Sequence, residues 1–252
     1  MSMFSDKLSA GQGVVGTFCH LGGAAVAECL SLSGLDYVII DTEHGPFSDE
    51  STGEMIRAIA LHQAEPFVRV RDSSRAAVLH ALDLGAKGII VPNVHTVEEA
   101  RSLVEYAKFF PTGNRGFAFS RSAAFGFASG LGNVQEYFSS TNSHTLLMPQ
   151  CETRGSLEHI EEIAALEGID GIFVGPYDLS VALGMPAKFQ TQEFRDALSR
   201  VLRACRDNKK LAFLYVNTMD EARASFQQGY QGVAIGTDTA FLVKSIRAML
   251  AQ

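Results

Sequence analysis

Polar side chains that could do chemistry follow or interrupt four short apolar runs of the sequence. They are found at Asp41–His44, at Arg69, at Gln150–Glu152 and at Gly175–Asp178. If the apolar runs are parallel strands of one barrel, the residues after each strand gather at one end of it, where such barrels carry their active sites. The four groups are therefore candidates for a single site.

Two carboxylates in these groups could hold a metal ion. Gln150 and Glu152 are two residues apart, so strand parity lets both side chains face the same side. Glu152 and Asp178 follow consecutive strands, and neighbouring parallel strands lie about 4.8 Å apart. Two carboxylates with no Cys or His partner favour a hard divalent cation such as Mg²⁺ or Mn²⁺. The alternative is a pair of solvated loop acids.

Arg69 and His44 are the candidates for charge stabilisation and proton transfer. Arg69 lies in the apolar sequence Phe67–Val70, where a permanent cation is costly unless an anion pairs with it. That anion is either a carboxylate in a structural ion pair or a developing enolate. His44 precedes Gly45-Pro46, a turn that could hold it facing the cavity as a general base, although a lone histidine is more often structural.

The elements that must position these residues are eight short runs rich in Val, Ile and Phe, separated by segments with helical periodicity. The predicted strands are Val14–Cys19, Tyr37–Asp41, Pro66–Val70, Gly88–Pro92, Thr145–Gln150, Gly171–Gly175, Leu211–Val216 and Gly232–Gly236. The predicted helices are Ala24–Leu32, Ser48–Gln63, Ser74–Leu84, Val97–Phe109, Leu157–Leu166, Gln192–Asn208, Met219–Gln227 and Ala240–Leu250.

Eight strand–helix units in 252 residues predict one α/β domain, a (β/α)8 TIM barrel over residues 1–252. A doubly wound open sheet is the alternative, but Gly22-Gly23 does not match the Gly-rich phosphate turn expected after its first strand. The connection Pro111–Ser143 is long for a compact domain, which predicts a functional loop.

Composition excludes several classes of protein. The formal charge of −7 argues against a nucleic-acid partner, and the 46% hydrophobic content argues against disorder. The longest uncharged stretch, 8–27, holds five glycines and is a poor bilayer span, and the first seven residues do not resemble a secretory signal. We therefore expect a cytoplasmic protein with no membrane partner. The four cysteines form no C-x-x-C and are expected to be reduced thiols.

Taken together, the motifs resemble the HpcH/HpaI family of class II aldolases over nearly the whole chain. The most specific are the D-x-E-H block at Asp41–His44, Arg115-Gly116, the Q-x-E-T block at Gln150–Thr153 and the G-P-x-D-L-S block at Gly175–Ser180. Each would be weak alone, but they occur jointly in family order.

The resemblance implies a (β/α)8 lyase that reversibly cleaves a 4-hydroxy-2-oxo acid to pyruvate and an aldehyde through a metal-bound enolate. The metal would be Mg²⁺, Mn²⁺ or Co²⁺. The resemblance implies that Glu152 and Asp178 are the metal ligands and that Gln150 is a polar contact beside them. It implies that Arg69 stabilises the enolate and that His44, paired with Asp83, forms the acid–base machinery. Backbone amides around Gly175, Pro176 and Tyr177 would receive the pyruvate carboxylate.

The resemblance also implies a homohexamer, a trimer of dimers that exchange the last helix, Ala240–Leu250. The chain departs from the family at Tyr177, where alanine is common, at Asn93, where methionine is common, and over the segment Met185–Gln192. Tyr177 leaves the shape of the pocket open. The alternatives are a lyase acting on malyl- or citramalyl-CoA, and a catalytically silent barrel that binds an oxo acid or a partner.

Overall fold

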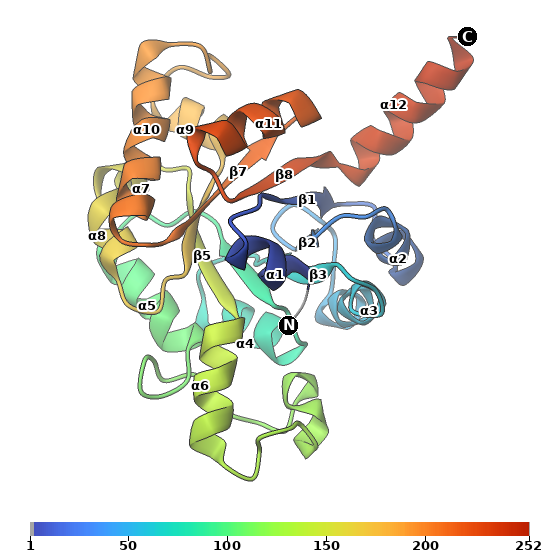
Figure 1. The fold of residues 1–252 in the computed structure, drawn as a ribbon, viewed down its shortest axis with the longest axis vertical. Coiled ribbons are helices and arrows are strands. Elements are labelled where there is room, and N and C mark those ends of the chain that lie inside the picture. Colours follow the sequence, from blue (N-terminus) through green and yellow to red (C-terminus); the bar gives the residue numbers. More distant parts are fainter. Residues whose placement is uncertain (1–2, 252) are drawn as a thin grey trace.

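The computed structural model describes residues 3–251, and its eight parallel strands close into a barrel in sequence order (Figure 1). The strands are β1 (Val14–Cys19), β2 (Tyr37–Asp41), β3 (Glu65–Arg69), β4 (Gly88–Val91), β5 (Leu146–Cys151), β6 (Gly171–Val174), β7 (Leu211–Val216) and β8 (Gly232–Thr237). Because β1 pairs with both β2 and β8, the sheet has no edge. The predicted TIM barrel is confirmed and the open sheet is excluded.

Helices alternate with the strands, and most of them surround the barrel (Figure 1). They are α1 (Met3–Ser9), α2 (Ala24–Leu32), α3 (Asp49–Ile59), α4 (Arg75–Asp83), α5 (Val97–Ala107), the 3-10 helix η1 (Arg121–Gly126), α6 (Val134–His144), α7 (Arg154–Glu158), α8 (Ile160–Ala165), α9 (Pro176–Ala182), α10 (Gln192–Asp207), α11 (Met219–Gln228) and α12 (Asp238–Leu250). Thr96, Thr191 and Thr218 cap their helices, each accepting from a backbone N–H three residues on.

The helical layer differs from the sequence prediction in four places. The stretch expected as the loop Pro111–Ser143 contains η1 and most of α6, and the predicted helix over 157–166 is divided by His159 into α7 and α8. The short helices α1 and α9 were not predicted. Each has seven residues, too few for a helical period to stand out.

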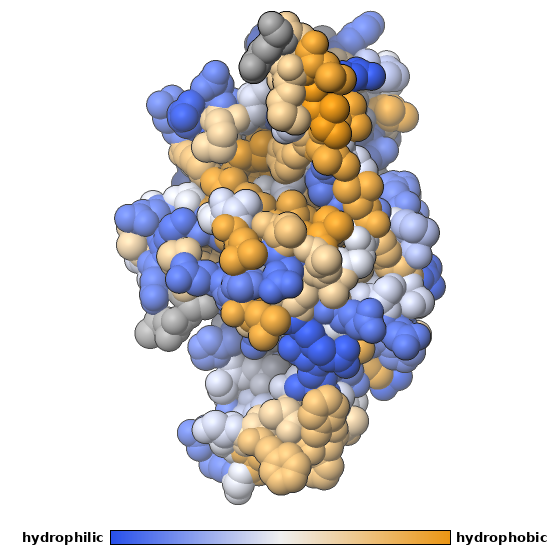
Figure 2. Space-filling view, turned by 90° about the vertical axis from the view of Figure 1, so that its right-hand side faces the viewer, coloured by the Kyte–Doolittle hydropathy of each residue, from blue (hydrophilic) through white to orange (hydrophobic). Residues whose placement is uncertain are grey.

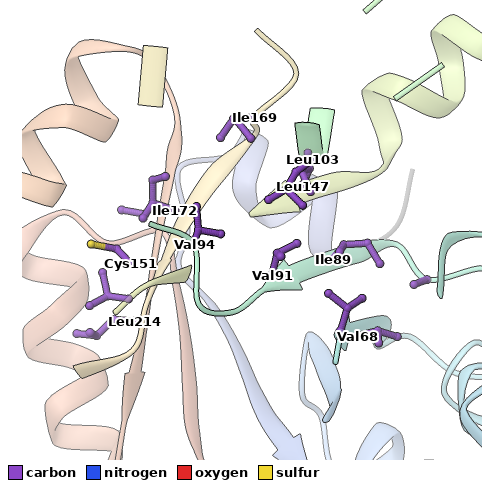
Figure 3. Packing of buried hydrophobic residues seen from close by; sticks show 14 of the residues in the cluster. Val68, Ile89, Val91, Val94, Leu103, Leu147, Cys151, Ile169, Ile172 and Leu214 are labelled. Carbon is purple, nitrogen blue, oxygen red and sulfur yellow. The ribbon is translucent and has the colours of Figure 1, made fainter. Parts of the chain in front are cut away.

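Two layers of apolar side chains form the core. Within β3, Phe67 points into the barrel and Val68 points outward to the helices, as alternating parity requires. Figure 3 shows the outward layer, in which Val68 and Val91 lie near Ile89 and Leu103. Residues of β3 that are two positions from Phe67 therefore also point into the barrel, and the other strands alternate in the same way. The last inward-facing residue of each strand lines the candidate site.

Helix α1 closes the amino-terminal end of the barrel. The Phe4 ring packs edge-on against Tyr37 and Phe67, with centroids 5.9 Å and 5.4 Å apart. The Nζ of Lys7 donates to Asp36 Oδ1 at 2.5 Å and ties the helix to the residue that precedes β2. The interior is thus filled and covered at this end.

A small lobe built by η1 and α6 is anchored through Lys108. Its Nζ is buried and donates to the carbonyl oxygens of Asn142 and Thr145, at 2.9 Å and 2.6 Å, and to Asp170 Oδ2 at 2.7 Å. Within the lobe, Phe109 stacks on Phe138 with ring centroids 4.3 Å apart. The lobe is therefore joined to the barrel by a buried cation as well as by aromatic packing.

Helix α12 leaves the barrel and projects away from it (Figure 1). The apolar side chains of this helix are exposed and gather in a band near the top of the face in Figure 2. They are Phe241, Leu242, Val243, Ile246, Met249 and Leu250. Within residues 3–251, no helix is both long enough and apolar enough to span a bilayer.

Candidate active site

Asp41 and Arg69 meet at the carboxyl ends of β2 and β3, where the strand register pairs them directly. Arg69 Nε donates to Asp41 Oδ1 at 2.9 Å and Nη2 donates to Oδ2 at 2.7 Å, a bidentate pair in a nearly water-free position. Burial alone would raise the pKa of Asp41, but hydrogen bonds from His20 and Arg69 outweigh it and hold that pKa well below its usual range. The anion that Arg69 requires is therefore already present as a carboxylate.

Asp41 also organises the turn that follows β2. Its Oδ1 accepts from the backbone N–H groups of Glu43 at 3.2 Å and of His44 at 3.4 Å. The turn needs a glycine at Gly45, because a Cβ there would lie 2.1 Å from the Asp41 carbonyl oxygen. One buried carboxylate thus fixes both the guanidinium and the turn that presents His44.

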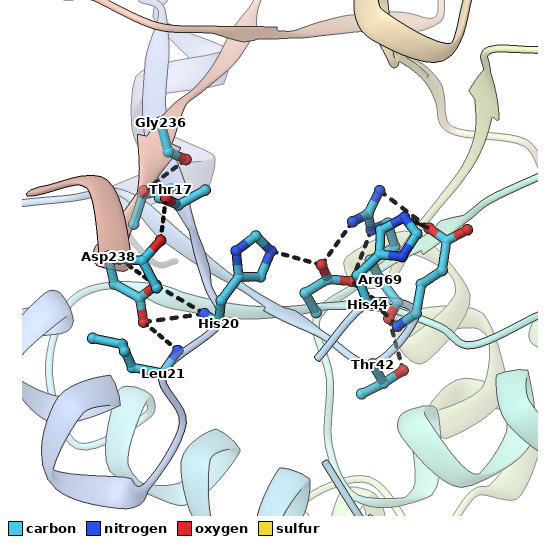
Figure 4. A network of polar contacts seen from close by, with 12 residues as sticks. Thr17, His20, Leu21, Thr42, His44, Arg69, Gly236 and Asp238 are labelled. Carbon is cyan, nitrogen blue, oxygen red and sulfur yellow. Dashed lines mark hydrogen bonds and ion pairs between the residues drawn. The ribbon is translucent and has the colours of Figure 1, made fainter. Parts of the chain in front are cut away.

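His20 is a site residue that the sequence interpretation missed. It follows β1, and its Nε2 lies 2.7 Å from Asp41 Oδ2, while its backbone N–H donates to Asp238. Figure 4 shows His20 and Arg69 pointing toward one another across this network. The available signal was parity, since His20 is two residues beyond the inward-facing Phe18 at a strand end.

Gln150 and Glu152 lie together as parity predicted. Gln150 Nε2 donates to Glu152 Oε2, and the other carboxylate oxygen accepts from the Asn93 backbone N–H at 2.7 Å. Gly175 leaves room for this pair, because a Cβ there would lie 2.7 Å from Gln150 Nε2 and 2.9 Å from Glu152 Oε2. A side chain at 175 would displace the carboxylate.

Negative charge accumulates around Glu152. Burial, with the nearby carboxylates of Glu43 and Asp178, raises the pKa of Glu152 to about 7. Burial also raises the pKa of Glu43 despite Arg69, whose Nη1 lies 3.1 Å from Glu43 Oε2. Gln150 Oε1 is buried without a hydrogen-bond partner. A divalent cation would relieve the repulsion among these carboxylates, so the residues present fit one.

The candidate ligands number only two. In the part of the chain that the structure describes, no three His, Cys, Asp or Glu side chains are grouped so as to hold a metal. A cation held by Glu152 and Asp178 would therefore keep several positions for water or substrate, as Mg²⁺ sites commonly do.

The side chains named above surround a cavity of about 190 Å³ at the carboxyl end of the barrel. Its polar lining residues are His20, His44, Arg69, Gln150 and Asp178. Its apolar and aromatic lining residues are Phe18, Phe173, Pro176, Tyr177 and Tyr215, and Gly175 and Thr237 complete the lining. The cavity can therefore contact both a charged group and an apolar group of one ligand.

The structure does not bring His44 and Asp83 together. His44 borders the cavity with its side chain 69% exposed, and its Nε2 lies 3.9 Å from Glu43 Oε2. Asp83 ends α4, and helices of such barrels end opposite the carboxyl ends of the strands. Its Oδ1 accepts from Arg115 Nη2 at 2.8 Å. The expected His44–Asp83 pair is therefore not formed within this chain, and Asp83 instead fixes Arg115, which precedes the lobe.

The cysteine beside Glu152 is excluded as a nucleophile. Cys151 points into the outer core layer and is almost completely buried, and burial raises the pKa of its thiol to about 12. A thiol with this pKa is protonated near neutral pH and is a poor nucleophile.

The sequence model of the HpcH/HpaI aldolase/citrate lyase family matches residues 15–245. The chain belongs to this family. It is 30% identical over 252 residues to a hydroxypyruvate/pyruvate aldolase of Roseobacter denitrificans, covering all of this chain and 97% of that one. It is also 30% identical over 249 residues to a 2-keto-3-deoxy-L-rhamnonate aldolase of Escherichia coli K12, with coverage of 99% and 92%.

The family resemblance extends to three dimensions. An HpcH/HpaI aldolase from Desulfitobacterium hafniense superposes with a TM-score of 0.91 at 27% identity, covering 100% of this chain and 96% of that chain. The named curated relatives are aldolases, which supports a lyase activity for this member of the HpcH/HpaI family.

Proposed function

We propose that this chain is a divalent-metal-dependent aldolase that reversibly cleaves a 4-hydroxy-2-oxo acid to pyruvate and an aldehyde. The observation that supports this most directly is the cavity in which Arg69, already paired with Asp41, borders the same space as Gln150 and Asp178, beside the buried Glu152. Cleavage leaves the electron pair of the C3–C4 bond on the pyruvate fragment as an enolate. The main chemical requirement of the site is therefore to stabilise this negative charge.

Glu152 and Asp178 would hold the metal, with Gln150 fixing the position of Glu152. When bound, a Mg²⁺, Mn²⁺ or Co²⁺ ion would act as a Lewis acid toward the oxo-acid oxygens. Arg69 places a second positive charge at the same side of the cavity, and its Asp41 pair holds the guanidinium plane in one orientation.

The turn at the start of α9 would receive the carboxylate of the oxo acid. Gly175 caps this helix and Pro176 occupies its first position, so the N–H groups of Tyr177 and Asp178 have no acceptor within the helix. Two such N–H groups beside the cavity can bind a carboxylate oxygen.

His44 would accept the proton of the C4 hydroxyl through a water molecule when the C3–C4 bond breaks, and C3 of the product enolate then takes up a proton to give pyruvate. His44 suits this task because it borders the cavity and stays open to solvent. Glu43 is the next candidate for the base, since burial raises its pKa.

The proposal is tested by incubating the protein with pyruvate and Mg²⁺, Mn²⁺ or Co²⁺ in D₂O and following loss of the methyl protons by NMR. Metal-dependent exchange that disappears on chelation is expected. Exchange without metal would contradict the metal site, and no exchange at all would favour a silent barrel. Cleavage of malyl- or citramalyl-CoA in a coupled assay would indicate the acyl-CoA lyase instead.

We also propose that the chain forms a homohexamer in which α12 packs on a neighbouring subunit. The support is the exposed apolar face of α12, which includes Leu242, Ile246 and Leu250. A contiguous apolar surface along most of a helix is typical of a helix that packs against a partner. Ile246→Glu should lower the assembly state seen by light scattering. An unchanged assembly, or a monomeric parent protein, would contradict the proposal.

A further inference from the structure

Three aromatic side chains at the candidate site, Tyr215, Tyr177 and Phe189, have no part in the proposed cleavage chemistry. Phe18, Tyr215, Tyr177 and Phe189 form a continuous row, called here the aromatic wall. Ring centroids are 5.9 Å apart for Phe18 and Tyr215, 6.1 Å for Tyr215 and Tyr177, and 5.0 Å for Tyr177 and Phe189. The interplanar angles of 59°, 64° and 89° are near the edge-to-face arrangement that aromatic pairs favour.

The aromatic wall lies beside the charged groups of the candidate site. Phe18, Tyr177 and Tyr215 border the cavity, and the polar groups Arg69, Gln150 and Asp178 border it too. At about 190 Å³ the cavity is smaller than the roughly 300 Å³ at which ordinary small-molecule pockets begin. An oxo acid as small as pyruvate occupies only part of this volume, so the aldehyde portion of a longer ligand can lie against the wall.

Tyr177 is the member of the wall whose position calls for a ligand. It is 46% exposed, although its ring is held on one side by Tyr215 and on another by Phe189. A groove of about 930 Å³ between α10 and α11 is also bordered by Pro176, Tyr177 and Tyr215, so these residues line two neighbouring hollows. A fixed and half-open ring beside free space is a surface on which another ring can pack.

The chemistry of the wall selects among aldehydes. Its four side chains carry no charge, and their only polar groups are the hydroxyls of Tyr177 and Tyr215. A chain of hydroxyl groups would lose water against the rings of the wall without regaining its hydrogen bonds, whereas an apolar planar group would gain contact.

We propose that the aldehyde released or added by this chain carries an apolar planar substituent, such as an aromatic ring, that packs on Tyr177 and Tyr215. The inference rests on the proposed aldolase function, because the aldehyde is its second product. It assigns Tyr177 and Tyr215 as specificity-determining residues, and Phe189 as a positioning residue that acts through Tyr177.

The test is aldol addition of pyruvate to benzaldehyde and to glyceraldehyde, with kcat/KM measured for each. Since the two aldehydes differ in intrinsic reactivity, the quantity compared is the benzaldehyde-to-glyceraldehyde ratio in a variant relative to the parent protein. Tyr177→Ala should lower the ratio about tenfold, the scale of a lost apolar contact in a specificity pocket. Tyr177→Phe should retain the ratio, because the ring is kept.

Two further variants separate the wall from general damage. Phe189→Ala should lower the ratio less than Tyr177→Ala, and through KM for benzaldehyde rather than kcat. Leu61→Ala removes an exposed apolar side chain from the opposite end of the barrel and should leave the ratio unchanged.

Pyruvate proton exchange in D₂O, measured on each protein, distinguishes the two ways to fail. If the parent exchanges pyruvate protons but Tyr177→Ala leaves the ratio unchanged, the specificity inference is overturned and the proposed function stands. If Tyr177→Phe loses the ratio as Tyr177→Ala does, the hydroxyl and not the ring is responsible, which also overturns it. No exchange in the parent overturns both.

Discussion

The guanidinium of Arg69 lies over the ring of Phe18, with its Cζ 4.9 Å from the ring centroid. This contact links Phe18 to the polar groups of the candidate site, because Arg69 is also paired with Asp41. A planar cation can stack on a ring and bind a carboxylate with two parallel hydrogen bonds at once, whereas an ammonium group cannot.

Arg69→Lys should therefore slow pyruvate proton exchange by about 10²-fold, the scale on which a lost charge-stabilising donor acts. The affinity for the divalent cation should change little, because the candidate ligands Glu152 and Asp178 remain. NMR of the exchange and a titration with Mn²⁺ measure the two quantities. An unchanged exchange rate would exclude Arg69 from stabilising the enolate.

The two histidines of the cavity should differ in their effect on turnover. His44→Ala should lower the cleavage rate by about 10²-fold, as expected for a lost general base. His20→Ala should lower it only several-fold, because His20 supports Asp41 and Arg69 remains to hold that carboxylate. A larger fall in cleavage rate for His20→Ala than for His44→Ala would assign proton transfer to His20. If neither variant lowers the cleavage rate, Glu43 becomes the candidate base.

The raised pKa of Glu152 makes the stability of the metal-free protein depend on pH. The carboxyl ionises at about 7 in the folded chain and near 4.5 when unfolded, so the folded state binds the extra proton between these values. The stabilising contribution is complete below pH 4.5 and is lost as the pH rises through 7, by an amount on the order of 3 kcal/mol.

Urea unfolding of the parent protein and of Glu152→Gln at pH 5 and pH 8, with EDTA present, measures this loss. The Gln variant should lose less stability over the interval, because its side chain does not ionise. Added Mg²⁺ should stabilise the parent most at pH 8. Identical pH dependence in both proteins would show that Glu152 does not carry the effect.

Lys108 should be essential for the stability of the lobe formed by η1 and α6. Lys108→Met leaves two carbonyl oxygens without their donor and Asp170 without its cation, at a cost of about 3 kcal/mol or more. Thermal unfolding measures the change. Lys188→Met is the matched control, since Lys188 is exposed and should alter stability by less than about 0.5 kcal/mol. Equal effects would contradict the anchoring role.

Parity along buried strands made the barrel and part of its site predictable from the sequence. It placed Gln150 beside Glu152 correctly, and the same rule applied to Phe18 would have found His20. The predicted barrel already places Asp83 at the other end, because its helices run back antiparallel to the strands, and the expected His44–Asp83 pair came from the family resemblance instead. The choice of Asp41 as the partner of Arg69 depended on strand register, which the sequence alone does not specify.

The closure of the barrel by Phe4 of α1 has a kinetic consequence. Because the amino-terminal end of the barrel is filled, the cavity opens to solvent only at the carboxyl end. The carboxylate of Glu152 is buried there, whereas the ring of Tyr177 is half-exposed. For the proposed reaction, the molecule bound at depth cannot pass the one bound at the rim. Pyruvate must therefore enter before the aldehyde in synthesis and leave after it in cleavage, so that pyruvate competes with the oxo acid while the aldehyde inhibits noncompetitively.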